Sequence, residues 1–247
     1  MTVSWIPADW PLTGKVIAGT TFRTGGVSQD EFDSLNLAAH VGDDPDAVAS
    51  NRRQLQFDCD LPSEPLWLRQ VHGTTVAIAP HTSAPGEADA IVTRELDNVC
   101  AILTADCLPV LFAADDGTEL GAAHAGWRGL CAGVLEDTVA AMHTSPDRIF
   151  AWFGPAISQP AFEVGSEVRE QFVDQDKTAE VHFSENDAGR WQADLYGLAT
   201  RRLQNCGVAR VFGGGLCTHA DQRRFFSYRR DGRCGRMASF IFREPDT

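Results

Sequence analysis

The stretch from residue 90 to residue 124 limits the possible folds of this chain more than any other part of the sequence. Four short segments in it have the length and the apolar composition of buried strands. They are Ala90–Thr93, Val99–Ala105, Leu108–Ala114 and Glu119–His124. The Asp115-Asp116-Gly117 sequence predicts a turn that joins the last two segments as a hairpin. The sequence therefore predicts neighbouring strands of a sheet in this region.

Predicted helices and further strands follow no regular alternation along the rest of the chain. Strands are expected at Lys15–Arg23, Leu66–Val71, Thr75–Ala79 and Arg148–Phe153, and a closing hairpin is expected from Phe225–Tyr228 and Met237–Phe242. Helices are expected at Asp44–Phe57, from Gly126 to Met142, at Glu167–Val173 and at Leu195–Asn205. Strands in runs, with helices inserted irregularly, favour an α+β fold with mixed sheets over a regular βαβ winding.

Composition and charge restrict the classes of partner. The chain has 247 residues and a formal net charge of −13, which disfavours nonspecific binding to nucleic acid or to an anionic membrane. The most apolar stretch, Val99–Ala114, is interrupted by polar residues and by Pro109, so it does not predict a membrane span. Seven cysteines without a C-x-x-C pair, and a start that lacks the pattern of a secretory signal, favour a cytoplasmic location.

Three potential metal ligands lie at or near predicted strand ends, each beside a small residue or a turn. They are His72, Cys107 and His124. Two imidazoles and a thiolate suit zinc, and three protein ligands leave a fourth position open, as a catalytic site requires. Two other interpretations stay open at this level. Cys107 is either the nucleophile of a metal-free Cys–His hydrolase or an ordinary core cysteine.

Several longer motifs carry a resemblance to a known family. In order, they read TFRTGGVS, SLNLAAHVGDDP, LRQVHGTTV, ADAIVT, LTADCLPVLF, AAHAGWRGL, WFGPAIS, FEVG and FFSYRRDGRCGR. The chain closely resembles the YfiH/YlmD family, also called the laccase-domain, multicopper polyphenol oxidoreductase or peptidoglycan-editing-factor family. The motifs cover nearly the whole chain, and AHAGWRG and TADC are the most specific of them.

The resemblance implies one domain over residues 1–247, with an α+β fold whose helices pack on mixed sheets. It implies a zinc ion, or copper in its place, held by His72, Cys107 and His124. It also implies phosphorolysis of adenosine, inosine, guanosine and methylthioadenosine to free base and ribose 1-phosphate, with deamination of adenosine to inosine. The expected partners are thus a purine nucleoside and phosphate, and no protein partner is indicated.

Three alternatives to this activity remain. The first is an amidase that edits a peptidoglycan precursor. The second is a polyphenol oxidase with a single copper, and the third is a nonenzymatic metal-binding protein. True multicopper laccase chemistry is rejected, because seven histidines with no His-x-His pair do not supply the imidazoles that several coppers need.

Further residues are expected to complete the site. Asp106, the residue before Cys107, is a candidate catalytic proton carrier, and a structural hydrogen-bonding role for it is equally open. Phosphate requires a local cationic pocket in such an acidic chain, and guanidinium groups match phosphate oxygens well. The expected substrate-binding residues are Arg23, Asn36, Arg128, Glu163, Tyr228, Arg229 and Arg230. Glu163 is a second candidate proton carrier or a helix cap, and Phe226 and Tyr228 are candidates for stacking on a purine.

Overall fold

The predicted hairpin is at the centre of the larger of two sheets that pack face to face. The computed structural model describes residues 2–12, 16–79 and 86–244. In the larger sheet six strands follow the order β13-β9-β7-β8-β5-β4. Their bounds are β4 Val76–Ile78, β5 Ala90–Thr93, β7 Leu108–Ala114, β8 Leu120–Ala125, β9 Ile149–Phe153 and β13 Arg210–Gly213.

The smaller sheet joins the two ends of the chain. Five strands follow the order β1-β2-β14-β6-β3. Their bounds are β1 Trp5–Pro7, β2 Val16–Thr21, β3 Leu66–Trp67, β6 Cys100–Thr104 and β14 Met237–Arg243. Strand β14 lies between β2 and β6 and pairs antiparallel with both of them.

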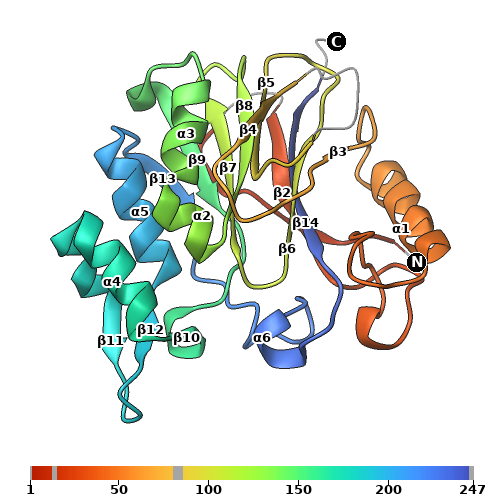
Figure 1. The fold of residues 1–247 in the computed structure, drawn as a ribbon. Helices are drawn as coiled ribbons and strands as arrows, with labels where there is room; N and C mark the ends of the chain where they lie inside the picture. Colours follow the sequence, from red (N-terminus) through yellow and green to blue (C-terminus); the bar gives the residue numbers. More distant parts are fainter. Residues whose placement is uncertain (1, 13–15, 80–85, 245–247) are drawn as a thin grey trace.

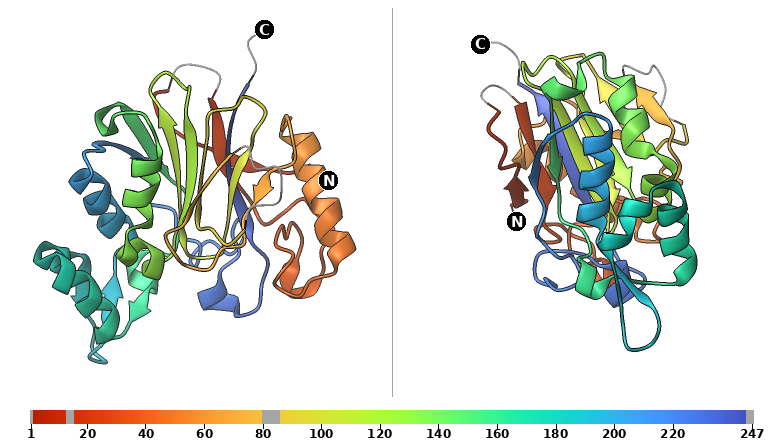
Figure 2. Two further views of the ribbon diagram at one scale, coloured as in Figure 1. Left: turned by 45° about the horizontal axis from the view of Figure 1, so that its top comes forward. Right: turned by 90° about the vertical axis from the view of Figure 1, so that its left-hand side faces the viewer.

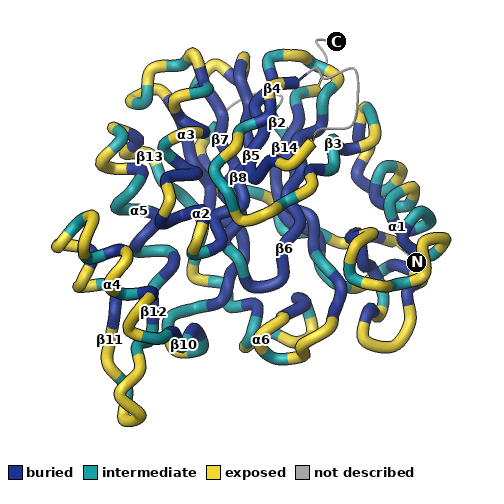
Figure 3. Tube along the Cα trace, in the orientation of Figure 1, coloured by how far each residue is buried: buried dark blue, intermediate teal, exposed yellow. Residues whose placement is uncertain are grey.

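Side chains of β7 alternate between two cores, as the period of two in a strand requires. Leu111 and Ala113 pack between the two sheets, together with Ile102 and Ile241 of the smaller sheet. Val110 and Phe112 pack on the other face, against the helices α2 Trp127–Ala132, α3 Val134–Ala141 and α5 Leu195–Asn205. All seven residues of β7 are therefore buried, which explains its continuous apolar sequence (Figure 3).

Helix α1, Pro45–Asp58, covers the outer face of the smaller sheet, where Leu55 packs with Leu103 and Phe240. The result is four layers, with helices on both outer sides of two sheets (Figures 1 and 2). A three-stranded sheet of β10 Glu163–Val164, β12 Trp191–Ala193 and β11 Phe183–Glu185 lies beside helix α4, Ser166–Gln175. The expected α+β class with mixed sheets is confirmed. None of the helices in the described part of the chain has the length and hydrophobicity to cross a bilayer.

Two predicted elements differ from the structure by more than a shift of their ends. The long helix after Gly126 is two helices, because Gly133 has φ of +109° and ends α2. The strand predicted to run to Val71 ends at Trp67, because the Gln70 side chain bonds both backbone groups of Leu103. The strand predicted for Lys15–Arg23 is β2, which ends at Thr21, and Lys15 lies outside the described residues.

The predicted closing hairpin is wrong. Phe225 and Phe226 form no strand, because both side chains are fully buried in a small cluster with Met237. Ser227 then accepts a hydrogen bond from Arg230 N and caps the short helix α6, Tyr228–Asp231. The second half of the predicted hairpin, β14, instead pairs with strands from the first half of the chain.

Candidate metal centre and substrate cavity

His72, Cys107 and His124 come together although they belong to three different segments. Cys107 directly precedes β7, His124 lies in β8, and His72 lies in the loop between β3 and β4. The pairing of Pro109 with His124 across β7 and β8 brings the cysteine beside the second histidine. The donor atoms of the three residues all lie within 4.8 Å of one another, and Cys107 Sγ is 3.9 Å from His72 Nε2.

Asp89, just before β5, positions both histidines, and the sequence analysis did not identify it. Its Oδ1 accepts hydrogen bonds from His72 N at 2.9 Å and from His124 Nδ1 at 2.8 Å. Its Oδ2 accepts bonds from Val71 N at 3.1 Å and from Gly73 N at 2.7 Å. An ionised carboxylate only accepts, so His124 Nδ1 carries a proton and Nε2 is left for a metal ion. The ADAIVT motif contained this residue, but nothing local in it indicated the contact.

The backbone is strained on both sides of the donor atoms. His72 has φ of +62° and Asp106 has φ of +95°, a region that residues other than glycine seldom adopt. Asp89 holds the first of these positions through His72 N. At the second, Asp106 Oδ1 accepts a bond from Thr218 Oγ1 at 2.6 Å and Oδ2 accepts one from Arg229 N at 2.7 Å. These contacts fix the corner from which Cys107 projects.

Gly126 keeps the centre open. A Cβ atom at this position would lie 2.9 Å from His72 Cδ2, 3.1 Å from Cys107 Sγ and 3.5 Å from His124 Cε1. Gly126 has φ of −62°, so its conformation does not itself require glycine. Glycine at this position therefore leaves open the space beside the three donor atoms, which a larger side chain would fill.

Cys107 and His124 influence each other's ionisation. Burial opposes the charged form of the Cys107 thiol, but the interactions with His124 and His72 outweigh it and lower the pKa of this thiol. Burial likewise opposes the charged form of His124, but Cys107 and Asp89 outweigh it and raise the pKa of this imidazole. Without a metal ion the pair thus favours a thiolate beside an imidazolium.

The donor set fits a zinc ion. One thiolate and two imidazoles, one of them oriented by a buried carboxylate, match the ligands of catalytic zinc sites with three protein donors. Within the described ranges this is the single group of three or more His, Cys, Asp or Glu side chains whose geometry would hold a metal. The centre opens on a cavity of about 400 Å³, within the range of roughly 300–1,000 Å³ for small-molecule sites.

Four of the other predicted site residues line this cavity. They are Asp106, Arg128, Tyr228 and Arg229. Arg128 is exposed and lies over the Trp127 ring, on a helix of only six residues. Arg229 donates from Nη1 to the backbone oxygen of Glu163 at 3.0 Å. The carboxylate of Glu163 contacts Asn186 and Arg190, and it does not cap α4, whose N-cap is Gly165.

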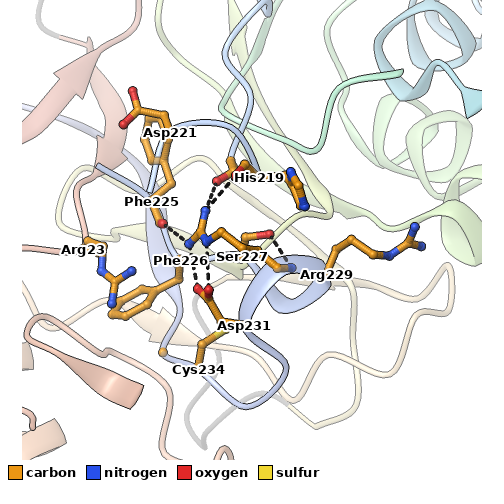
Figure 4. Close-up of polar contacts among 12 residues, drawn as sticks. Arg23, His219, Asp221, Phe225, Phe226, Ser227, Arg229, Asp231 and Cys234 are labelled. Carbon is orange, nitrogen blue, oxygen red and sulfur yellow. Dashed lines mark hydrogen bonds and ion pairs between the residues drawn. The ribbon is translucent and has the colours of Figure 1, made fainter. Parts of the chain in front are cut away.

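Arg23, Asn36 and Arg230 do not line the cavity and are bonded to the surrounding protein. Arg23 donates to the backbone oxygen of Asp33. Its guanidinium lies over the Phe226 ring (Figure 4). Phe226 is fully buried, so it packs in the core and does not face a purine. Asn36 is fully buried and bonded to Ala38 and Asp43.

Arg230 links several parts of its own loop. Its Nη1 donates to the backbone oxygens of Thr218 and His219, and its Nη2 donates to Phe225 O at 3.0 Å. It also pairs with Asp231 at 2.7 Å. Arg229 extends away from Asp231 and Arg23 in Figure 4, consistent with its separate position at the cavity.

The cavity also contains polar residues that the sequence analysis did not select. They are His40, Gln70, Thr104 and Arg236. His40 belongs to the HVGDD stretch, Thr104 to TADC and Arg236 to DGRCGR, all of which lie within recognised motifs. Motif membership was therefore the available signal, and the sequence offered no reason to choose these members over their neighbours.

The chain matches known proteins along nearly its whole length. Residues 17–244 match the family described as multi-copper polyphenol oxidoreductase laccase. The purine nucleoside phosphorylase YfiH of Escherichia coli is 51% identical over 238 residues, which is 96% of this chain and 98% of the relative. The purine nucleoside phosphorylase PA4543 of Pseudomonas aeruginosa is 50% identical over 242 residues, which is 97% of this chain and 98% of the relative.

Solved structures give the same result for the fold. Protein NMB0706 of Neisseria meningitidis superposes with a TM-score of 0.94 at 46% identity, covering 98% of this chain and 99% of that one. YlmD of Geobacillus stearothermophilus superposes with a TM-score of 0.90 at 30% identity, covering 98% and 96%. The resemblance noted in the sequence is thereby confirmed. The chain belongs to the multi-copper polyphenol oxidoreductase laccase family, whose members include proteins named YfiH and purine nucleoside phosphorylase.

Proposed function

We propose that this chain is a zinc-dependent purine nucleoside phosphorylase. In this proposal it converts adenosine, inosine, guanosine and methylthioadenosine to the free base and the ribose 1-phosphate, and it deaminates adenosine to inosine. The single observation that carries the proposal is the convergence of His72, Cys107 and His124 on one cavity. The names of close relatives support the reaction class.

The three donors would hold the metal, with copper as the competing ion. A bound zinc ion would supply a Lewis acid that polarises a substrate oxygen or activates a water molecule. Asp89 keeps the proton on His124 Nδ1 and fixes the backbone of His72, so that both rings stay oriented. Both carboxylate oxygens of Asp106 accept hydrogen bonds, which supports its structural role more than proton transfer.

The cavity wall would bind the nucleoside. Phe162, Trp127 and the exposed ring of Tyr228 offer apolar faces for a purine. Arg128 and Arg229 supply positive charge for the ribose or phosphate end of the substrates. Charge supports the choice of small molecules over nucleic acid or membranes, because the chain as a whole carries −13.

The test is to incubate the protein with adenosine in the presence and absence of phosphate and to identify the products. Adenine formed only with phosphate indicates phosphorolysis, and inosine indicates deamination. Removal of the metal should abolish both products, and added zinc should restore them. Product formation at full rate by metal-depleted protein would contradict the proposal.

A second candidate is a metal-free cysteine amidase that acts on a peptidoglycan precursor. The favoured thiolate of Cys107 beside the protonated His124 supports it, because this pair resembles an activated Cys–His nucleophile. The thiolate would attack the amide carbonyl, His124 would protonate the leaving amine, and water would hydrolyse the resulting thioester. This candidate predicts activity that survives chelation and an acyl adduct on Cys107 detectable by mass spectrometry.

A further inference from the structure

We propose that Arg236, Thr104 and His40 form an oxyanion subsite of the cavity and that this subsite binds inorganic phosphate. The inference rests on the proposed phosphorolysis and assigns its second substrate to residues that are not among the substrate-binding residues expected from the sequence. All three residues line the same cavity as the candidate metal centre.

The charge of the cavity favours an anion. Three arginines line it, namely Arg128, Arg229 and Arg236, whereas Asp106 is the single acidic residue among the described lining residues. Both oxygens of Asp106 are already hydrogen-bonded to Thr218 and Arg229. A chain with a net charge of −13 therefore contains a cavity with excess positive charge, where an anion gains from the local field.

Arg236 is held in position by its own surroundings. Its Nη1 donates to the backbone oxygens of Cys234 at 2.8 Å and Gly235 at 3.0 Å, and its backbone N–H donates to Asn36 Oδ1 at 3.0 Å. Within the described part of the chain, Nε and Nη2 make no hydrogen bond. One edge of a fixed guanidinium fork is thus left for a bidentate contact with phosphate oxygens.

Thr104 supplies a second, independent indication of a ligand. It is 1% exposed, and its Oγ1 has no hydrogen-bond partner among the described residues. Unpaired buried polar atoms are rare and unfavourable in folded proteins. Thr104 is the last residue of β6 and lies opposite Met237 in the ladder, so it is next to the backbone of Arg236. A ligand oxygen at this wall would supply the partner that the hydroxyl lacks.

His40 completes the subsite from a different segment. His40 is an exposed residue of the cavity wall. Partial desolvation lowers the pKa of His40, and the nearby charges of Arg236 and Arg52 lower it further, which favours the neutral ring. A neutral imidazole still has one N–H to donate to an anion. Asn36 ties the segment before His40 to Arg236 through Oδ1, so this predicted substrate-binding residue would act by positioning.

The two other arginines of the cavity fit a phosphate site less well. Arg128 is exposed and lies over Trp127, with its guanidinium carbon 4.4 Å from the ring centroid. Arg229 is exposed, bonds Glu163 O through Nη1, and has its guanidinium carbon 5.5 Å from the ring centroid of Phe162. Arg236 also lies near a ring that we assign to the nucleoside, with its guanidinium carbon 5.9 Å from the ring centroid of Tyr228. It differs from the other two because it is the chain neighbour of Met237, which lies opposite Thr104 in the ladder.

The experiment compares the zinc-loaded wild type with Arg236→Gln, Thr104→Val and Arg128→Ala. Arg223→Gln is the matched control, because Arg223 is exposed in the same segment and does not line the cavity. Titration with inorganic phosphate in a calorimeter gives its dissociation constant directly. Initial rates at varied phosphate give KM, and deamination of adenosine gives an activity that needs no phosphate.

Loss of a hydrogen bond to a charged group should weaken phosphate binding about 10- to 100-fold in Arg236→Gln and about 10-fold in Thr104→Val. We expect a smaller effect in Arg128→Ala and no change in Arg223→Gln. The melting temperature of Thr104→Val should not fall, because valine keeps the shape and removes an unpaired hydroxyl. Weaker phosphate binding without lower stability is a result that a purely structural role would not produce.

An unchanged phosphate dissociation constant in folded Arg236→Gln and Thr104→Val would overturn the subsite, as would a larger effect from Arg128→Ala. Phosphate binding and adenine formation together distinguish a wrong subsite from a wrong reaction. If the wild type binds phosphate through Arg236 but forms no adenine, the subsite holds and phosphorolysis is wrong. If the wild type forms adenine with an unchanged phosphate KM in Arg236→Gln, phosphorolysis holds and the subsite is wrong. A wild type that neither binds phosphate nor forms adenine would overturn both.

Discussion

Replacement of Asp89 by asparagine should damage both the fold and the metal centre. The carboxylate accepts four hydrogen bonds of 2.7 to 3.1 Å, two on each oxygen, and its side chain is fully buried. An asparagine has one oxygen, so in either orientation its NH₂ group faces two N–H donors. Hydrogen bonds to a charged group contribute about 1.5–3 kcal/mol each. Loss of two of them should lower the free energy of unfolding by about 3–6 kcal/mol.

The same change should weaken metal binding, because Asp89 orients His72 and His124. Loss of such an orienting partner typically lowers metal affinity about 10- to 100-fold. Urea denaturation of metal-free protein measures the first effect, and competition for zinc with a chromophoric chelator measures the second. We expect both effects in Asp89→Asn.

Glu119→Gln is the matched control for this experiment. Glu119 is also a buried carboxylate, and it accepts bonds from His143 N, Thr144 N and Thr144 Oγ1 and pairs with Arg94, away from the metal centre. It should lose stability to a similar degree and keep its zinc affinity. Equal zinc affinity in Asp89→Asn and wild type, or an equal loss of affinity in both variants, would refute the argument that Asp89 acts on the ligands.

Further predictions concern the metal centre and the response to acid. Gly126→Ala should reduce bound metal at least about tenfold with little loss of fold, because the new Cβ meets Cys107 Sγ at 3.1 Å while φ of −62° suits alanine; elemental analysis and circular dichroism check this, and unchanged metal content would contradict it. His124→Ala should likewise lose its metal and stay folded. Cys107→Ser should lower phosphorolysis and deamination together if the sulfur is a ligand, and product assays that show one activity spared would oppose that role. Burial opposes the charged form of Glu119, but hydrogen bonds from His143 and Thr144 outweigh it and lower the pKa of Glu119 below its ordinary value of 4.5. The stability it contributes is thus present above pH 4.5 and lost as the pH falls through the folded pKa. The difference between wild type and Glu119→Gln in urea should therefore shrink below pH 4.5, and a constant difference would contradict this assignment.

The strands of the larger sheet were predictable from local sequence. Ala90–Thr93 and Leu108–Ala114 have the predicted bounds, and β8 is shifted by one residue from the prediction. Their apolar runs and the turn at residues 115–117 are properties of neighbouring residues, so no distant contact was needed to recognise them. The three metal-ligand candidates followed from residue chemistry together with the family motifs.

The tertiary structure alone decided which remaining motif residues face the cavity. Asp106 and Thr218 are 112 residues apart, and Arg236 and Asn36 are 200 residues apart, so no local pattern reports their contacts. Two arginines of the same motif consequently differ. Arg230 bonds the protein through both Nη1 and Nη2, whereas the guanidinium of Arg236 bonds the protein through Nη1 alone within the described residues. Local periodicity records which face of an element is apolar. The partner of a buried polar group is chosen only when the chain folds, because the hydrogen bond that satisfies it comes from whichever segment packs there.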